Sequence, residues 1–290
     1  MTSTPESSVR TVSSAPSSSV SSASGGDGDR ATAGTARPWP LVRHSLALAG
    51  RSLTKTRRNP GVLLDALILP VIFLVLFVYL FGGAVAGSTR EYLQYLFPGI
   101  LVLTTVLAGQ VSTGLSIVTD MKKGVFDRFR SMPVPRAALL VGSVLADAIR
   151  YVIAVVVLFG VGYLLGFRVE TDLASALAAT ALAIGFGFSL SWLTVLVAVL
   201  LRDETMVSTV GFLLPFPLVF GTGMAAPAET MPGWLRAWAD VNPVSHAIEA
   251  SQGLLLGGPV AGPVGMTLLW GGVFLAVFGT AAITAYRRLI

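Results

Sequence analysis

The chain has 290 residues, of which 53% are hydrophobic and only 12% are charged. Soluble domains carry about twice this charged fraction, and the mean hydropathy is +0.76. Several segments of roughly 18 or more residues with few or no charges exclude a large soluble protein with a rich core. The net charge of +5 would suggest nucleic acid as a partner of a soluble protein, but basic loops of a membrane protein explain it better, so no nucleic acid is expected. No cysteine is present, which excludes disulfides, thiol catalysis and cysteine-ligated metals.

The first 59 residues divide into two predicted segments. Residues 1–40 are rich in Ser and Gly and predict a disordered cytoplasmic tail. They lack the apolar centre of a signal peptide. Residues 41–59 predict an amphipathic helix in the membrane interface, the alternative being an ordinary cytoplasmic helix packed on the protein. Its apolar residues are Val42, Leu46, Ala49 and Leu53, and its basic residues are Arg43, Arg51, Lys55 and Arg58.

Residues 60–290 predict an all-α membrane domain, because several runs reach the roughly 18 residues needed to cross a bilayer. We place six transmembrane helices near 61–82, 95–118, 142–166, 174–200, 207–224 and 262–284. An even number puts both termini on one side. Only Arg90, Arg168 and Arg236, of 20 basic residues, fall in connections on the other side, so the positive-inside rule makes both termini cytoplasmic.

Two of these segments carry more than apolar residues. The second has a stripe of small and polar residues at helical spacing: Thr105, Gly109, Ser112, Thr113 and Ser116. Such a stripe fits close helix packing, and equally a translocation path or a subunit interface. The fifth contains Pro215 and Pro217, which must interrupt its hydrogen-bond ladder, and a broken helix at membrane depth is typical of a pathway.

Charged residues near the ends of the spans have structural and functional interpretations. Asp147 and Arg150 lie three apart in the third span, where they can form a structural ion pair. Asp65 and Asp147 could instead serve a proton relay, but both lie far from the midplane. Between the fifth and sixth spans, residues 225–261 are too apolar for a free loop and too interrupted to cross, which predicts short extracellular re-entrant helices.

The sequence contains few residues suited to chemistry. No GxxxxGK[ST] phosphate loop occurs. No HExxH motif or carboxylate cluster occurs, and His44 and His246 are predicted on opposite sides of the membrane. Ser245 and His246 are adjacent and cannot form a nucleophile–base pair on one helix face. We therefore expect no catalytic, cofactor-binding or metal-binding residue on this chain, and no enzyme activity of its own.

The segment 119–136, TDMKKGVFDRFRSMPVPR, is a basic insert between the second and third spans. Met121, Val125 and Phe129 recur at helical spacing, and Pro133 and Pro135 close the segment just before the third span. The pattern predicts a short amphipathic helix on the cytoplasmic side. It can lie on lipid or dock on a partner, and it is continuous with a membrane helix.

The run GVFDRFRSMPVPRAALLVGSVLADAIR, from Gly124 to Arg150, resembles the signature of type-2 ABC exporter permeases, the ABC-2 membrane family, and within it the daunorubicin/doxorubicin-resistance type of actinobacteria. RRNPGVLLDALILPVIFLVLFVYLFGG, YLFPGI and NPVSHAIEASQGLLLG agree with it, so the resemblance covers nearly everything after residue 40. The long Ser-rich tail departs from the family.

The resemblance implies that the insert is a coupling helix that docks on a separate ATPase subunit. That subunit would carry the ATP and Mg. The implied contact residues are Met121, Val125, Phe126, Asp127, Arg128, Phe129 and Arg130. It implies a complex of two permease chains, expected to be a homodimer, with two ATPase chains. The permease chains would lie in the bacterial cell membrane. The expected function is export of a hydrophobic or amphipathic small molecule. A proton-coupled multidrug carrier without an ATPase and a non-transporting membrane scaffold are the alternatives.

Overall fold

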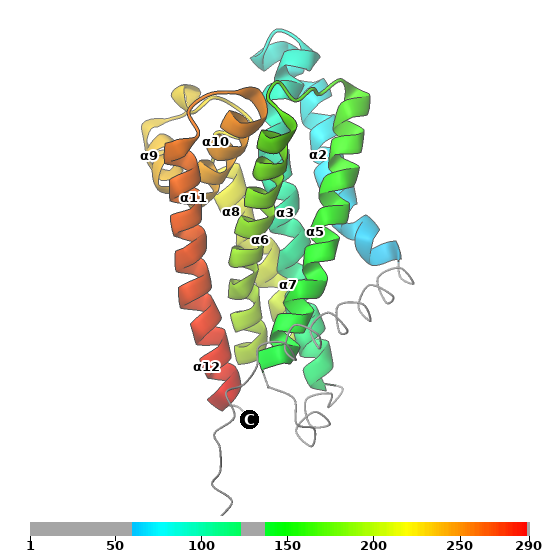
Figure 1. Cartoon of the computed structure of the whole chain (residues 1–290), viewed down its shortest axis with the longest axis vertical. Helices are drawn as coiled ribbons and strands as arrows, with labels where there is room; N and C mark the ends of the chain where they lie inside the picture. The colour runs from blue at the N-terminus through cyan, green and yellow to red at the C-terminus, as the bar shows by residue number, and fades with distance from the viewer. Residues whose placement is uncertain (1–59, 123–136, 289–290) are drawn as a thin grey trace, which may run out of the picture. The chain divides into compact units, whose positions relative to one another are not determined.

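The computed structural model describes residues 60–122 and 137–288, all of which belong to one compact unit, Pro38–Ile290 (Figure 1). The described part is helical and contains no strand. The predicted tail at 1–40, the predicted interfacial helix at 41–59 and residues 123–136 of the insert lie outside the described residues. The elements are α2 (Pro60–Val85), α3 (Thr89–Lys122), α5 (Ala137–Leu165), α6 (Leu173–Leu201), α7 (Glu204–Leu213), α8 (Pro215–Phe220), a 3-10 turn (Ala228–Thr230), α9 (Gly233–Val241), α10 (Pro243–Leu256), α11 (Ala261–Phe274), a π turn (Leu275–Gly279) and α12 (Thr280–Arg288).

Helices therefore occupy each of the six ranges predicted to span the membrane. In the described part, four are long and apolar enough to cross a bilayer: Ile68–Val85, Thr89–Thr119, Leu173–Leu201 and Ala261–Tyr286. Arg150–Leu165 and Glu204–Phe220 are apolar but shorter. Six crossings and the side on which the termini lie stay predictions.

The helix boundaries depart from the predicted spans where a polar cap extends the helix beyond the apolar run. The backbone N–H of Glu91 donates to the Ser88 hydroxyl at 3.2 Å, so α3 begins six residues before the predicted 95. The Asp203 carboxylate accepts from the Met206 N–H at 2.8 Å and starts α7 before the predicted 207. Hydropathy marks where a helix is apolar, and caps mark where it begins.

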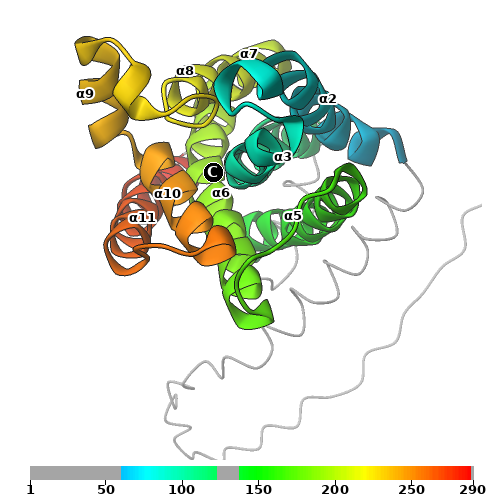
Figure 2. The same cartoon turned by 90° about the horizontal axis from the view of Figure 1, so that it is seen from above.

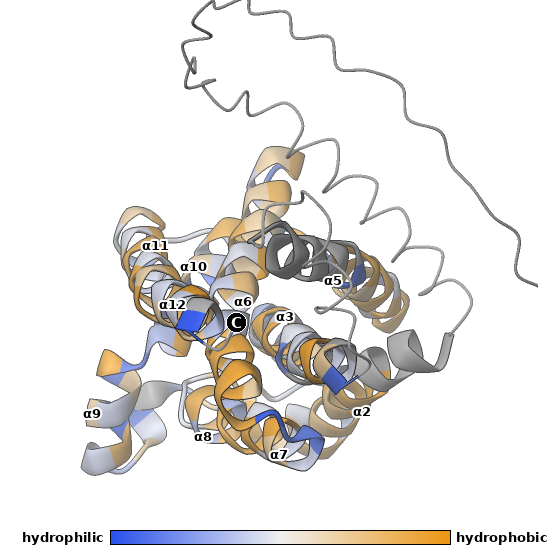
Figure 3. Ribbon diagram, turned by 90° about the horizontal axis from the view of Figure 1, so that it is seen from below, coloured by the Kyte–Doolittle hydropathy of each residue, from blue (hydrophilic) through white to orange (hydrophobic). Residues whose placement is uncertain are grey.

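The helices form a bundle around α3 and α6, which share the most extensive contact of any pair (Figure 2). α2 and α5 pack on α3, while α10, α11 and α12 pack on α6. The α2–α3 connection and α10 lie at one end of the bundle, and α12 ends at the other (Figure 1). Seen from that second end, hydrophilic ribbon lies at the ends of α12 and α3, at the start of α7 and around α9 (Figure 3).

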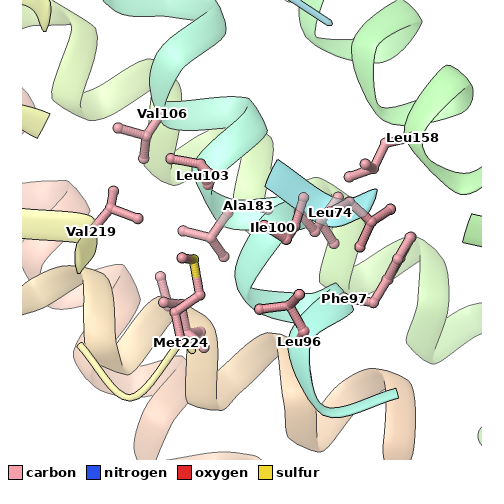
Figure 4. Packing of buried hydrophobic residues seen from close by; sticks show 14 of the residues in the cluster. Leu74, Leu96, Phe97, Ile100, Leu103, Val106, Leu158, Ala183, Val219 and Met224 are labelled. Atoms are coloured by element: carbon pink, nitrogen blue, oxygen red, sulfur yellow. The ribbon is translucent and has the colours of Figure 1, made fainter. Parts of the chain in front are cut away.

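Two hydrophobic clusters hold the bundle together, one near each end. The larger joins residues such as Leu74 of α2, Phe97 and Ile100 of α3, Leu158 of α5 and Ala183 of α6 (Figure 4). The smaller is built from Ile117, Val118, Trp192, Val195, Ala198, Val199, Val207, Ala282 and Tyr286. Lipid tails are as apolar as these side chains, so in a bilayer the clusters hold the helices together by close packing. Polar side chains lie between the two clusters, and they define the candidate site.

Candidate functional site

The stripe predicted on the second span lies inside the chain, against α6. Thr105 and Thr113 are completely buried. Their hydroxyls donate to carbonyls of their own helix, Thr105 to Val102 at 2.9 Å and Thr113 to Gly109 at 2.7 Å. Ser116 is half-buried and donates to the Thr113 carbonyl at 2.9 Å. The side chain of Ser112 lies outside the described residues. The hydroxyls are therefore satisfied within α3 and need no partner helix.

Close approach of α3 and α6 depends on a glycine in each helix. A Cβ on Gly187 of α6 would lie 2.7 Å from the carbonyl oxygen of Thr105, so the backbones touch at this point. A Cβ on Gly114 of α3 would lie 2.9 Å from the Thr194 methyl group. This is the small-residue packing that membrane helices use when no hydrophobic force distinguishes lipid from protein. A path or subunit interface at this stripe stays a prediction.

Sequence reasoning missed Gln110, which is buried at the centre of this seam. The Thr194 hydroxyl of α6 donates to the Gln110 side-chain oxygen, linking the two helices. The Gln110 Nε2 is buried and has no partner among the described residues. The presence of an amide side chain in an otherwise apolar span could have identified Gln110 from the sequence. Burying a polar group without a hydrogen bond is costly, so such a residue is expected to have a partner on a neighbouring helix.

Tyr151 of α5 closes the other side of the stripe. Its hydroxyl occupies the place that a Cβ on Gly109 would take, only 1.6 Å from that position. Tyr151 is 1% exposed, so a complete phenol ring fills the space that the missing side chain leaves. Gly109 thus serves packing of α3 on α5, Gly187 serves packing of α3 on α6, and Gly114 serves packing of α3 on both α6 and α7.

The predicted break in the fifth span is present between α7 and α8. α7 ends at Leu213 and α8 begins at Pro215, which is buried, whereas Pro217 is exposed. The side-chain amide of Asn242 donates to the Leu218 carbonyl at 2.6 Å, which supplies a partner from outside the broken helix. The same Asn242 accepts from the Val244 N–H at 3.0 Å and caps α10.

Two tyrosines of α3 hold the chain that follows α8. The Tyr92 hydroxyl donates to the Ala225 carbonyl at 2.7 Å, and the Tyr95 hydroxyl donates to the Gly223 carbonyl. Gln252 of α10 donates to the Tyr95 carbonyl at 3.3 Å. The start of α3, the turn after α8 and α10 therefore form one connected unit. The predicted re-entrant segment contains short helices, and their depth in the membrane stays a prediction.

The described part of the basic insert is its first turn, at the end of α3. Lys122 pairs with Glu204 of α7 at 3.1 Å, with both side chains about half exposed. Met121 packs against the smaller hydrophobic cluster. The other predicted contact residues, Val125, Phe126, Asp127, Arg128, Phe129 and Arg130, lie outside the described residues. The insert thus leaves from a helix end that is fixed to the start of α7.

The predicted Asp147–Arg150 pair stays a prediction, because the Asp147 side chain lies outside the described residues. Arg150 is half-buried at the start of the apolar part of α5. Within residues 60–122 and 137–288 no three His, Cys, Asp or Glu side chains gather where they could hold a metal. The described residues offer close helix packing, a polar seam between α3 and α6, and a broken helix at α7–α8.

Comparison with known proteins agrees with this architecture. The family model described as "ABC-2 type transporter" matches residues 43–256. The chain is 40% identical over 247 residues to the daunorubicin resistance ABC transporter permease protein DrrB1 of Streptomyces coeruleorubidus, covering 85% of this chain and 87% of that protein. It is 27% identical over 248 residues to the probable doxorubicin resistance ABC transporter permease protein DrrC of Mycobacterium tuberculosis, covering 86% and 90%. It is 28% identical over 216 residues to the putative transport permease ycf38 of Cyanophora paradoxa, covering 72% and 73%.

Proposed function

Because the chain belongs to the ABC-2 type transporter family, we propose that it is the permease subunit of an ATP-binding cassette exporter that moves a hydrophobic or amphipathic small molecule out of the cell. The single observation that carries the proposal is the match of the family model over residues 43–256, which includes every helix from α2 to α10. The chain is an integral membrane protein, as its four apolar helices and its family require.

The substrate class follows from the names of two relatives, one a daunorubicin and the other a doxorubicin resistance permease. Both names denote resistance to drugs, so an amphipathic drug, antibiotic or lipid-like molecule is the proposed cargo. The polar seam of α3 and α6 is compatible with such a cargo. A passage lined by Thr105 and Thr113 requires α3 and α6 to separate, because both side chains are completely buried between them.

The energy source is proposed to be a separate ATPase, because the sequence has no GxxxxGK[ST] phosphate loop. Two ATPase chains would carry the ATP and Mg and act on two permease chains, which we propose form a homodimer. The coupling helix of the insert would be the contact, through Phe126, Arg128 and their neighbours.

The fold supplies a route from the insert to the membrane helices. The insert connects Lys122 at the end of α3 to Ala137 at the start of α5. Through the Lys122–Glu204 ion pair it also adjoins α7, which leads directly to the break at Leu214. A displacement of the insert would therefore act on α3, α5 and the broken helix together. With six crossings and cytoplasmic termini, the insert faces the compartment that contains ATP.

The test uses Phe126→Ala and Arg128→Glu in the full chain, expressed together with its cognate ATPase, which is to be sought as a GxxxxGK[ST] protein encoded by a neighbouring gene. Both variants should lose ATPase co-purification and daunorubicin efflux from cells, while their amount in the membrane stays unchanged. Arg288→Glu is the matched control for charge reversal, because Arg288 is exposed at the end of α12 and lies outside the insert.

Normal ATPase binding and efflux in both insert variants would disprove the coupling role. A second experiment distinguishes the ATP-driven exporter from the proton-coupled carrier. Daunorubicin transport is measured with the purified chain alone in liposomes, with a pH gradient and no nucleotide. Daunorubicin transport there would refute an obligatory ATPase. A scaffold, the third possibility, would transport in neither experiment.

A further inference from the structure

A cavity of about 260 Å³ lies where the end of α2, the start of α3 and the end of α5 meet. The three helices contact one another, and Figure 2 shows them grouped at one side of the bundle. The lining residues are Val78, Tyr79, Thr89, Arg90, Leu165, Gly166 and Arg168. Two of these are arginines far apart in sequence, Arg90 in the first turn of α3 and Arg168 in the connection that follows α5. The sequence analysis used both only as markers of membrane orientation.

Arg168 is held in place by the end of α5. Its Nη1 donates to the Phe167 carbonyl at 2.7 Å and to the Tyr163 carbonyl at 3.0 Å. Its guanidinium lies 5.5 Å from the centre of the Tyr163 ring, within the range of a cation–π contact. Its backbone N–H donates to the Gln94 side chain at 3.3 Å. Among the described residues these side-chain hydrogen bonds use Nη1, so Nε and Nη2 are available to a ligand.

The backbone around Arg168 is equally well fixed. Gly166 has φ of 107°, a conformation that favours glycine, and ends α5 at the cavity wall. Phe167 is completely buried, and its ring stacks on Phe97 of α3 with centroids 3.8 Å apart. The ring of Phe97 in turn packs where a Cβ of Gly162 would lie. The cavity wall is therefore preorganised rather than assembled by a ligand.

Arg90 brings a second positive charge to the same cavity from the first turn of α3. Glu91 follows Arg90 in the sequence, and Glu170 lies two residues after Arg168. Among the described residues, however, neither arginine belongs to an ion pair. Arg90 and Arg168 are both exposed at this cavity, so an anion between them would reach both positive charges. A phosphate suits them, because guanidinium forms two parallel hydrogen bonds to its oxygens.

The cavity opens beside an apolar surface of the bundle. Tyr79 of α2 is 67% exposed and Leu164 of α5 is 88% exposed. Further along the same helices, Leu76 and Leu80 of α2 and Val152 and Val156 of α5 are also exposed. In an integral membrane protein such side chains contact acyl chains wherever no second protein chain covers them. A ligand that fits both regions has an anionic head and apolar tails.

We propose that this cavity binds the phosphate headgroup of an anionic phospholipid, with its acyl chains against α2 and α5. Basic pockets between membrane helices bind lipid headgroups by the same chemistry. A soluble anion would use the two arginines but gain nothing from the apolar surface. In the proposed topology this lipid belongs to the outer leaflet, and only that assignment rests on the proposed function. The lipid is a bound component of the bilayer, distinct from the exported molecule.

The experiment measures lipid binding to the purified full chain in neutral detergent by native mass spectrometry. The probes are phosphatidylglycerol and phosphatidylcholine with identical acyl chains. Phosphatidylglycerol should bind more tightly, and Arg90→Gln should weaken it about tenfold, the effect of losing one hydrogen-bonded charge. Arg236→Gln is the matched control, because Arg236 is exposed on α9, outside the cavity, and its loss changes net charge equally.

Three outcomes would overturn the proposal: equal binding of the two lipids, equal effects of Arg90→Gln and Arg236→Gln, or displacement of the lipid by an equal concentration of inorganic phosphate. The last would indicate a free-anion site. Arg168→Lys is the second variant, and it should weaken binding while thermal stability stays near that of the parent. None of these measurements requires an ATPase or transport, so their failure would leave the proposed function intact.

Discussion

Replacing Gly187 with alanine tests the contact between α3 and α6. The added Cβ would lie 2.7 Å from the Thr105 carbonyl oxygen, whereas ordinary contacts begin at 3.4 Å. The obstructing atoms are backbone, so no side-chain rotation relieves the clash. The two helices would have to separate locally by about 0.7 Å, the shortfall between these two distances.

The magnitude follows from this separation. A gap of about 0.5–1 Å forfeits a quarter to a half of each dispersion contact across it, and overpacking a well-packed interior costs about 1–3 kcal/mol. Alanine favours a helix over glycine by about 1 kcal/mol, which opposes the loss. We therefore expect Gly187→Ala to lower the free energy of unfolding by up to about 2 kcal/mol, the difference between these two terms.

The matched control is Gly185→Ala, two residues earlier in α6. Gly185 is exposed, and a Cβ there would have no heavy atom within 4 Å. It should be neutral or stabilising by up to about 1 kcal/mol. The assay is SDS titration of the purified chain in micelles, followed by circular dichroism. If Gly187→Ala is as stable as Gly185→Ala, α3 and α6 do not approach as closely as described.

Two further predictions concern hydrogen bonds. Thr194→Val removes the donor to the Gln110 side-chain oxygen and should lower the free energy of unfolding in the same SDS titration by about 1–3 kcal/mol. The double variant with Gln110→Leu should recover most of that loss, and an unchanged stability of Thr194→Val would contradict the link. Asp172 caps α6, and hydrogen bonds from Ser175, its side chain first, lower the pKa of the Asp172 carboxyl below the ordinary value of 3.8. The stabilisation is therefore present above that value and lost as pH falls through the lower folded pKa. Asp172→Asn can still cap the helix but does not titrate, so it should reduce the fall in Tm between about pH 5 and pH 2. Identical Tm profiles of the variant and the parent would refute the role of Asp172.

The sequence predicted the helical segments because their signals are local. The prolines of the fifth span, for example, act within one turn of the chain and predicted the break at Pro215. Long apolar runs predicted where those helices cross a membrane. Boundaries were missed where a cap, such as Ser88, lies outside the apolar run. The π turn at Leu275–Gly279 has no sequence signal that we can identify.

The direction in which each helix faces was not predictable from the sequence. A helix apolar all round does not reveal which face meets lipid and which meets protein, because both environments are apolar. The stripe of Thr105 and Thr113 was compatible with a passage, a subunit interface or packing. Only the tertiary structure places it against α6 and shows Tyr151 filling the space over Gly109.

The sequence alone determined the class of protein: an all-helical membrane permease with a basic insert and no phosphate loop of its own. Composition and local motifs suffice for that, since they depend on the identity of neighbouring residues. The tertiary structure decided which distant residues meet. Arg90 and Arg168 share one cavity because α2, α3 and α5 pack together at their ends, and Lys122 meets Glu204 because α7 returns to the end of α3. Such pairings arise from helix packing across the whole bundle, which no local pattern encodes.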